Sequence, residues 1–227
     1  YYTPESGIGL AIRQNPRRRD PDPARRGLRI GAIGQGVGTL LGLAEEGDTV
    51  RYYEINPQVL DVANRIFFFT RESAARYESA LGDGRIQMEK ELKEKGSDQF
   101  DVIAIDAFTS DAIPMHLLTV EAAQLYFKHL KADGILAIHI TNRYINLAPV
   151  VLGMAETIGL KATMIDADAK EATSAARSQW VMLTNNREWL DQPNVGLASE
   201  YPVRLPAGYK PVVWTDDNAS LWPLLRF

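Results

Sequence analysis

Residues 28–39, LRIGAIGQGVGT, join a short apolar run to a loop that carries three glycines. A helical pattern follows over residues 40–46, and the segment 49–55, TVRYYEI, is rich in residues that favour β-strands. Glycines directly after a strand let the backbone turn tightly and leave the N–H groups at the start of the next helix exposed. A strand, a glycine loop, a helix and a second strand in this order predict a βαβ unit with two parallel strands.

The same alternation continues along the chain to about residue 183. Apolar runs predict strands at residues 28–33, 49–55, 77–81, 100–105, 135–140, 161–165 and 179–183. Residues at helical spacing predict helices at 40–46, from Pro57 with Asn56 as its cap, at 86–95, from Thr119 to near Asp133, and at 147–158. We therefore expect an α/β fold with a Rossmann-like, seven-stranded, mostly parallel sheet between helical layers.

The 227 residues divide into three parts. Residues 1–27 are expected to be an irregular N-terminal remnant because glycines and prolines interrupt them, and their charge run at 17–26 is expected to be a solvated loop. Residues 28–184 are expected to form a nucleoside-binding α/β domain, and residues 185–227, rich in Pro and Trp, a C-terminal flap on the same domain. The chain starts with Tyr1 rather than Met, which is consistent with a segment of a longer parent chain.

Composition excludes several classes of function. The chain has 25 Lys and Arg against 29 Asp and Glu, a net charge of −4, whereas a nucleic-acid binder needs a basic face. It has no Cys, which excludes disulfides, thiolate zinc sites and thiol nucleophiles. Its three His show no metal-ligand spacing, so we expect no metal. No apolar run approaches the ~20 residues that span a bilayer.

Polar residues that follow the expected strands are the first candidates for a ligand site, because ligands of open α/β sheets bind at the carboxyl ends of the strands. Glu54 ends the second strand, twenty residues after Gly34, where a carboxylate can accept hydrogen bonds from both hydroxyls of a ribose. Asp83 and Asp106 follow the third and fourth strands. Three acids repel the phosphates of NAD but attract the sulfonium of S-adenosylmethionine or of its decarboxylated form.

Four motifs occur in order along the chain: GQGVGT at 34–39, YEINP at 53–57, LGDG at 81–84 and FDVIAID at 100–106. Together with DAFTSDAIP at 106–114 they resemble the successive motifs of the spermidine synthase family, the polyamine aminopropyltransferases. The resemblance runs from about residue 1 to residue 183 and is greatest to the domains fused to membrane segments in bacteria. It implies the fold of class I S-adenosylmethionine-dependent methyltransferases, and a cytoplasmic enzyme or the cytoplasmic domain of an inner-membrane protein.

The resemblance also assigns roles to matching residues. Asp106 would be the general base or electrostatic partner of the attacking amine, and Asp111 would hold the ammonium of the acceptor. Tyr2, Trp214 and Asp217 correspond to positions that contact the substrate. The group donor, S-adenosylmethionine or decarboxylated S-adenosylmethionine, would be bound by Gly34, Gln35, Gly36, Gly38, Glu54, Ile55, Asp83 and Gly84, with Glu54 on the ribose and Asp83 on the adenine amino group.

Each of these assignments has a structural alternative. Asp106 can cap a loop, Asp111 can cap the following helix, Tyr2 can be an ordinary packed aromatic residue, and residues 214–217 can form a surface turn. His139, at the end of the fifth expected strand, and the late strand that contains Trp180 are interpreted as structural.

The sequence departs from the family pattern in three places. Val37 stands where the family carries an aspartate that grips the aminopropyl ammonium. The loop between Asp106 and Asp111 is two residues longer. The N-terminal β-hairpin domain of the family is missing or reduced to residues 1–27.

We therefore expect an aminopropyltransferase that moves an aminopropyl group from decarboxylated S-adenosylmethionine to a polyamine acceptor, a small-molecule amine. Two alternatives stay open: an S-adenosylmethionine-dependent methyltransferase, which Val37 favours, and a non-catalytic domain that senses a nucleoside or polyamine. A membrane-embedded segment in a longer parent chain and a homodimer also stay open as partners, whereas nucleic acid is not expected. An NAD-dependent dehydrogenase is disfavoured by the glycine spacing and the acids.

Overall fold

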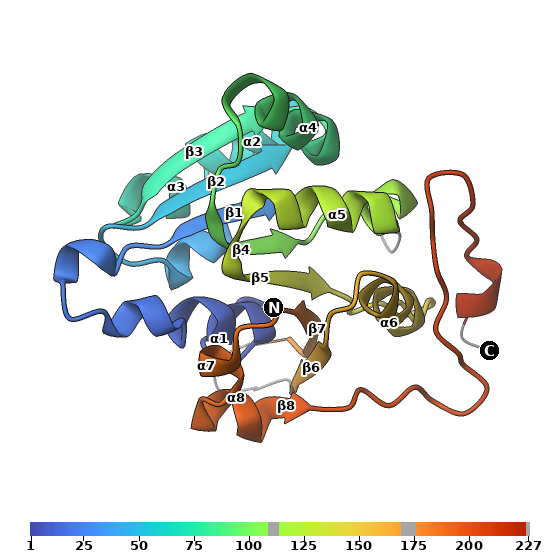
Figure 1. Ribbon diagram of the computed structural model, residues 1–227. Coiled ribbons are helices and arrows are strands. Elements are labelled where there is room, and N and C mark those ends of the chain that lie inside the picture. Colours follow the sequence, from blue (N-terminus) through green and yellow to red (C-terminus); the bar gives the residue numbers. More distant parts are fainter. Residues whose placement is uncertain (109–113, 169–175, 226–227) are drawn as a thin grey trace.

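The computed structural model describes residues 1–108, 114–168 and 176–225, and in this part of the chain eight strands form one sheet (Figure 1). The strands are β1 (Arg29–Ile33), β2 (Thr49–Glu54), β3 (Arg76–Leu81), β4 (Phe100–Ile105), β5 (Leu130–His139), β6 (Ala162–Ala167), β7 (Ser178–Leu183) and β8 (Ser199–Glu200). Their order across the sheet is β3-β2-β1-β4-β5-β7-β6-β8.

The sheet is parallel from β3 to β5 and antiparallel beyond. β7 runs antiparallel to both of its neighbours, β5 and β6, and β8 is antiparallel to β6. The predicted α/β fold with a mostly parallel sheet is confirmed. The sequence predicted seven strands, and the eighth is a two-residue edge strand, which pairs with Met164 and Ile165 of β6 and is too short to give a pattern of its own.

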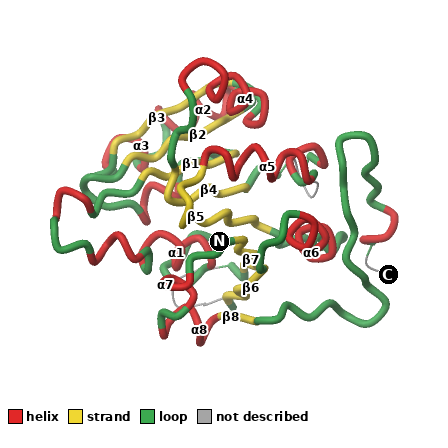
Figure 2. The backbone as a smooth tube through the Cα atoms, in the orientation of Figure 1, coloured by secondary structure: helices red, strands yellow, loops and turns green. Residues whose placement is uncertain are grey.

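Helices cover both faces of the sheet (Figure 2). They are α1 (Gly7–Arg13), α2 (Pro57–Arg65), α3 (Phe69–Glu72), α4 (Gly84–Lys95), α5 (Val120–His129), α6 (Ala148–Thr157), α7 (Arg187–Leu190) and α8 (Pro193–Ala198), with 3₁₀ turns at Pro16–Arg19, Pro23–Arg25, Thr39–Leu43, Met115–Leu117 and Trp222–Leu224. Alternate side chains of β4 enter two cores: Ile103 and Ile105 pack with α4, α5 and α6, and Val102 and Ala104 pack with α1.

Local signals place most of the helix starts. The side chain of Asn56 accepts a hydrogen bond from the backbone of Gln58, and Pro57 occupies the first turn, as the sequence predicts. Thr119 caps α5 in the same way through Ala122. The expected helix at 40–46 is instead a 3₁₀ turn at Thr39–Leu43, and Gly38 precedes it with a left-handed backbone, at φ +86°.

The N-terminal segment differs from the expectation of an irregular remnant. Residues 7–12 are buried in helix α1, and the hydroxyl of Ser6 caps the helix by accepting a hydrogen bond from the N–H of Gly9. The sequence GIGLAIR does not predict this helix, because it contains two glycines and glycine has a low helix propensity. The glycines are needed for packing: a Cβ on Gly7 would lie 2.4 Å from the Cβ of Trp180.

The charge run at 17–26 is also not simply a solvated loop. Arg18 donates two hydrogen bonds, of 2.7 and 2.6 Å, to the carboxylate of Asp48, whose side chain is fully buried just before β2. Its Nε also donates to the carbonyl of Ile12 near the end of α1. Arg17 pairs with Asp101 of β4 at 2.8 Å. These two arginines hold the N-terminal segment against the amino edge of the sheet.

The tail after β8 runs beside α5 and α6 (Figure 1). The N–H of Val120 donates to the carbonyl of Trp214, and the N–H of Val212 donates to the carbonyl of Pro149, both at 2.9 Å. In the described ranges, no helix is long and apolar enough to cross a membrane.

We predict that Arg18→Met lowers the free energy of unfolding by about 3 kcal/mol, because it leaves the buried Asp48 carboxylate without its cation. Urea denaturation followed by circular dichroism measures this. The control Arg25→Met removes an arginine that is 72% exposed and 3.6 Å from Asp22, and its effect should stay within about 0.5 kcal/mol. Equal effects of the two substitutions would mean that the Arg18 pair does not anchor the segment.

Candidate functional site

The order of the strands reverses at β1, whose neighbours are β2 on one side and β4 on the other. Such a switch point opens a crevice at the carboxyl ends of the strands. The loop that follows β1 has positive φ at three glycines, +92° at Gly34, +52° at Gly36 and +86° at Gly38. A Cβ on Gly34 would lie 2.3 Å from the carbonyl oxygen of Asp106, whereas a Cβ on Gly36 would meet nothing within 4 Å. Gly34 therefore serves packing, and Gly36 lies beside open space.

Glu54 lies on one side of this loop. Its carboxylate is 7% exposed and accepts hydrogen bonds from the backbone N–H groups of Gln35 and Asn56, both at 2.9 Å. The side-chain oxygen of Gln35 accepts a 3.0 Å hydrogen bond from the hydroxyl of Tyr77, and its buried amide nitrogen has no partner in the described part of the chain. These hydrogen bonds connect the end of β2 to the glycine loop, and the ribose role of Glu54 stays a prediction.

Asp83 and Gly84 lie at the carboxyl end of β3. The Asp83 carboxylate caps α4 by accepting from the N–H of Ile86 at 3.0 Å, and its other oxygen lies 2.8 Å from Nε2 of His116. Gly84 starts α4 close to β1, since a Cβ there would lie 2.7 Å from the Cγ2 of Ile33. Asp83 thus caps a helix, which the sequence analysis did not predict, and its second oxygen lies beside an imidazole.

Asp106 lies on the opposite side of the glycine loop from Glu54, and its side chain is 16% exposed. One carboxylate oxygen accepts a hydrogen bond from the hydroxyl of Tyr2, and the other lies 2.7 Å from Nδ1 of His139. Burial, and secondarily the Asp106 charge, raise the pKa of Tyr2 well above its usual value, so the phenol stays protonated and donates. The structure thus brings together Asp106 and Tyr2, two residues that lie 104 positions apart.

Aromatic rings surround the imidazole of His139, which contacts this carboxylate. The imidazole of His139 stacks on Trp180 with ring centroids 4.6 Å apart and planes at 17°. It meets the ring of Phe108 edge-on at 5.3 Å and that of Tyr1 at 5.2 Å. The sequence predicted neither His139 nor Trp180 as a site residue. The signal that could have found them is the register of β5, which pairs with β4 on one side and with β7, where His139 lies opposite Trp180, on the other.

The remaining predicted residues lie elsewhere. Ile55 follows Glu54 and is exposed. Trp214 is buried in the core that contains α5 and α6, where its indole N–H donates to the carbonyl of Ser220 at 3.1 Å. Asp217 is exposed on the turn between Thr215 and Asn218. Asp111 lies outside the described residues. In the described part of the chain, Ile55, Trp214 and Asp217 have no contact with Asp106, and the roles of these three and of Asp111 stay predictions.

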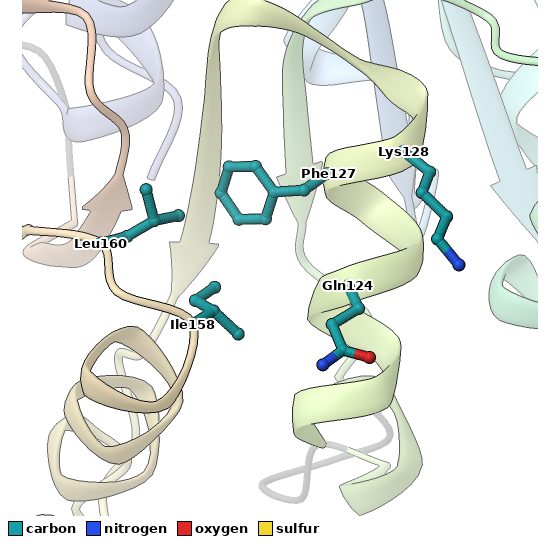
Figure 3. A pocket seen from close by; sticks show the side chains of 5 residues that line it. All are labelled: Gln124, Phe127, Lys128, Ile158 and Leu160. Carbon is teal, nitrogen blue, oxygen red and sulfur yellow. The ribbon is translucent and has the colours of Figure 1, made fainter.

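Among the described residues, two of the hollows lie away from Asp106. One, of about 550 Å³, lies beside His116 and is lined by Arg85, Thr119 and Asp216 among others. Hydrogen bonds from Arg85 lower the pKa of Asp216 to about 2, so this pair is ionised at neutral pH. The other, of about 460 Å³, is an apolar hollow between α5 and α6 (Figure 3), lined by Gln124, Phe127, Lys128, Ile158 and Leu160. Among the described residues, no three His, Asp or Glu side chains lie close enough together to hold a metal ion.

The sequence is similar to that of a polyamine aminopropyltransferase from Vibrio vulnificus (strain CMCP6). The two are 32% identical over 117 residues, which is 52% of this chain and 38% of the relative. The chain thus spans well under half of the curated relative that it matches. No family model matches the chain.

Solved structures show the same fold. A spermidine synthase from Thermotoga maritima superposes with a TM-score of 0.58 at 14% identity, covering 93% of this chain and 66% of that protein. A probable spermidine synthase from Corynebacterium glutamicum gives 0.60 at 15% identity, covering 95% and 82%. Human methyltransferase-like protein 13 gives 0.60 at 19% identity, covering 84% and 85%. The predicted class I methyltransferase fold and the resemblance to the spermidine synthases are confirmed.

The two glycines of the loop give a matched pair of tests. We predict that Gly34→Ala lowers the free energy of unfolding by about 3 kcal/mol or more, because its Cβ collides with the Asp106 backbone at a strained φ. Gly36→Ala should cost only about 1 kcal/mol, the backbone strain alone. Chemical denaturation measures both. Losses of equal size would contradict the close approach of β1 and β4.

Proposed function

We propose that this chain carries the residues that bind the group donor and the amine acceptor in a spermidine synthase-like aminopropyltransferase. It would transfer the aminopropyl group of decarboxylated S-adenosylmethionine to a polyamine or another small amine. The observation that carries the proposal is a row of carboxylates, Asp83, Glu54 and Asp106, that follows the ends of β3, β2 and β4 on both sides of the glycine loop. A cationic nucleoside and an ammonium acceptor are the ligands that such a row attracts.

The donor side of the proposal rests on the glycine loop and its neighbours. Glu54 is held by backbone N–H groups at both oxygens, which leaves lone pairs for the two hydroxyls of a ribose. The open space at Gly36 lets a ligand approach the backbone closely. The sulfonium of the donor would then lie near the loop, between Glu54 and Asp106. Spermidine synthase has been solved with the transition-state analogue AdoDATO, on the same fold.

The reaction itself needs little beyond positioning and one proton transfer. The amine nitrogen attacks the carbon next to the sulfonium, the new N–C bond forms as the C–S bond breaks, and methylthioadenosine leaves with the bonding electrons. An alkylammonium cannot attack until it loses a proton. Asp106 accepts two hydrogen bonds, one on each oxygen, and the remaining lone pairs can orient the ammonium and take its proton.

A methyltransferase that uses intact S-adenosylmethionine is the second candidate. Val37 supports it, because an apolar side chain in the glycine loop gives the aminopropyl ammonium no carboxylate to pair with. Neighbours of the same fold have been solved with SAH, the human methyltransferase-like protein and an O-methyltransferase from Bacillus cereus among them. The same Asp106 could then act on a methyl acceptor.

We predict that the protein, incubated with decarboxylated S-adenosylmethionine and a panel of diamines, forms methylthioadenosine, which chromatography of the nucleoside products detects. S-adenosylhomocysteine formed from intact S-adenosylmethionine would favour the methyltransferase instead. Tight nucleoside binding in a thermal-shift assay, with no product from either donor, would contradict both enzymes and favour the sensing domain.

Asp106→Asn should lower kcat about a hundredfold or more, because an amide cannot accept the proton of the amine. The variant should fold, since the Tyr2 hydroxyl can turn to accept from the new amide. It should also keep the rise in Tm that methylthioadenosine causes in the wild-type protein.

The control is Asp191→Asn, an exposed residue at the end of α7. Unchanged turnover in the Asp106 variant would remove this residue from the mechanism.

A further inference from the structure

The imidazole of His139 is placed beside Asp106 by the pairing of two strands. β4 and β5 are parallel, with Ile105 opposite Ile138, so the residues that follow each of them lie side by side at the carboxyl edge. Nδ1 of His139 lies 2.7 Å from the carboxylate of Asp106. A carboxylate only accepts hydrogen bonds, so Nδ1 carries the proton and donates it.

The ring has almost no freedom to leave this position. His139 is 3% exposed. The β5–β7 register sets it directly opposite Trp180, which stacks on one face of the ring, and Phe108 closes on it edge-on. Such close ring contacts restrict both torsions of a histidine.

The second ring nitrogen of His139, Nε2, distinguishes this residue from a histidine that has only a packing role. Nε2 of His139 is buried and has no partner among the described residues. The other buried histidine, His129, satisfies both nitrogens: Nε2 donates to the carbonyl oxygen of Met88 at 2.9 Å, and Nδ1 accepts a 3.3 Å hydrogen bond from the backbone N–H of Asp98. A buried polar atom left unpaired costs free energy, and such costs are typical of functional sites.

We propose that His139 is a positioning residue for Asp106. This inference rests on the proposed function, in which Asp106 receives the amine. The Nδ1–H of His139 fixes one carboxylate oxygen and the Tyr2 hydroxyl fixes the other, so the carboxyl plane cannot rotate. The free lone pairs then point in constant directions, which holds the amine in line with the carbon that it attacks. The stack on Trp180 transmits the rigidity of the sheet to this pair.

Two substitutions separate this role from a general fold defect. The amide nitrogen of His139→Asn can take the place of Nδ1 and donate to Asp106, whereas that of His139→Gln reaches nearer to the position of Nε2. We expect the Gln variant to lose about tenfold to a hundredfold in kcat with an unchanged KM for the donor. The Asn variant should recover most of this loss.

The matched control is His129→Asn, which removes the other buried histidine beside an aspartate. It should lower Tm without lowering the kcat of the folded fraction, since His129 lies at the opposite edge of the sheet from Asp106. Equal kcat values in the Asn and Gln variants of His139, or a kcat that only follows Tm, would overturn the proposal.

A second measurement does not depend on turnover. In nuclear magnetic resonance spectra of protein labelled with ¹⁵N-histidine, His139 should show a protonated Nδ1 whose signal moves in Asp106→Asn. The signal of His129 should not move. An Nε2–H form of His139, or a spectrum indifferent to Asp106→Asn, would overturn the inference. A wild-type protein with no transferase activity but with this Asp106-dependent signal would overturn the proposed function and leave the His139–Asp106 pair standing.

Discussion

The close approach of two backbone segments at the carboxyl edge of the sheet governs the site. Gly34 follows β1 with its α-carbon so near the carbonyl of Asp106 that no side chain fits between them. This contact brings the ends of β1 and β4 together at the point where the strand order reverses. The loop from Gly34 to Gly38 then turns with positive φ at its three glycines, and Gly36 within it is exposed.

The order of the strands then places the polar side chains of the candidate site in a row along this edge. Asp83, Glu54, Asp106 and His139 follow or end β3, β2, β4 and β5, and they lie along the edge in the order of the strands. Each carboxylate has fixed donors: backbone N–H groups for Glu54, a helix start and His116 for Asp83, Tyr2 and His139 for Asp106. Donors of this kind hold a negative charge in place without neutralising it as a lysine would.

The N-terminal segment links the stability of the fold to the site. Arg17 and Arg18 attach it to the amino edge through Asp101 and Asp48, and α1 packs its small residues against Trp180. Tyr2 precedes this helix and reaches across to Asp106. The same segment therefore contributes both to the core and to the carboxylate on which the proposed chemistry depends.

The sequence by itself determined the mostly parallel sheet, most element bounds and the glycine loop with its three acids, because periodicity, helix caps and glycine are local signals. It also placed Asp106 after β4 correctly. Only the tertiary structure decided that His139 lies beside Asp106 and stacks on Trp180, since strand register joins residues far apart in the chain. It likewise decided that residues 7–13 form a helix. There, packing against Trp180 requires the glycines that make the segment look irregular in the sequence.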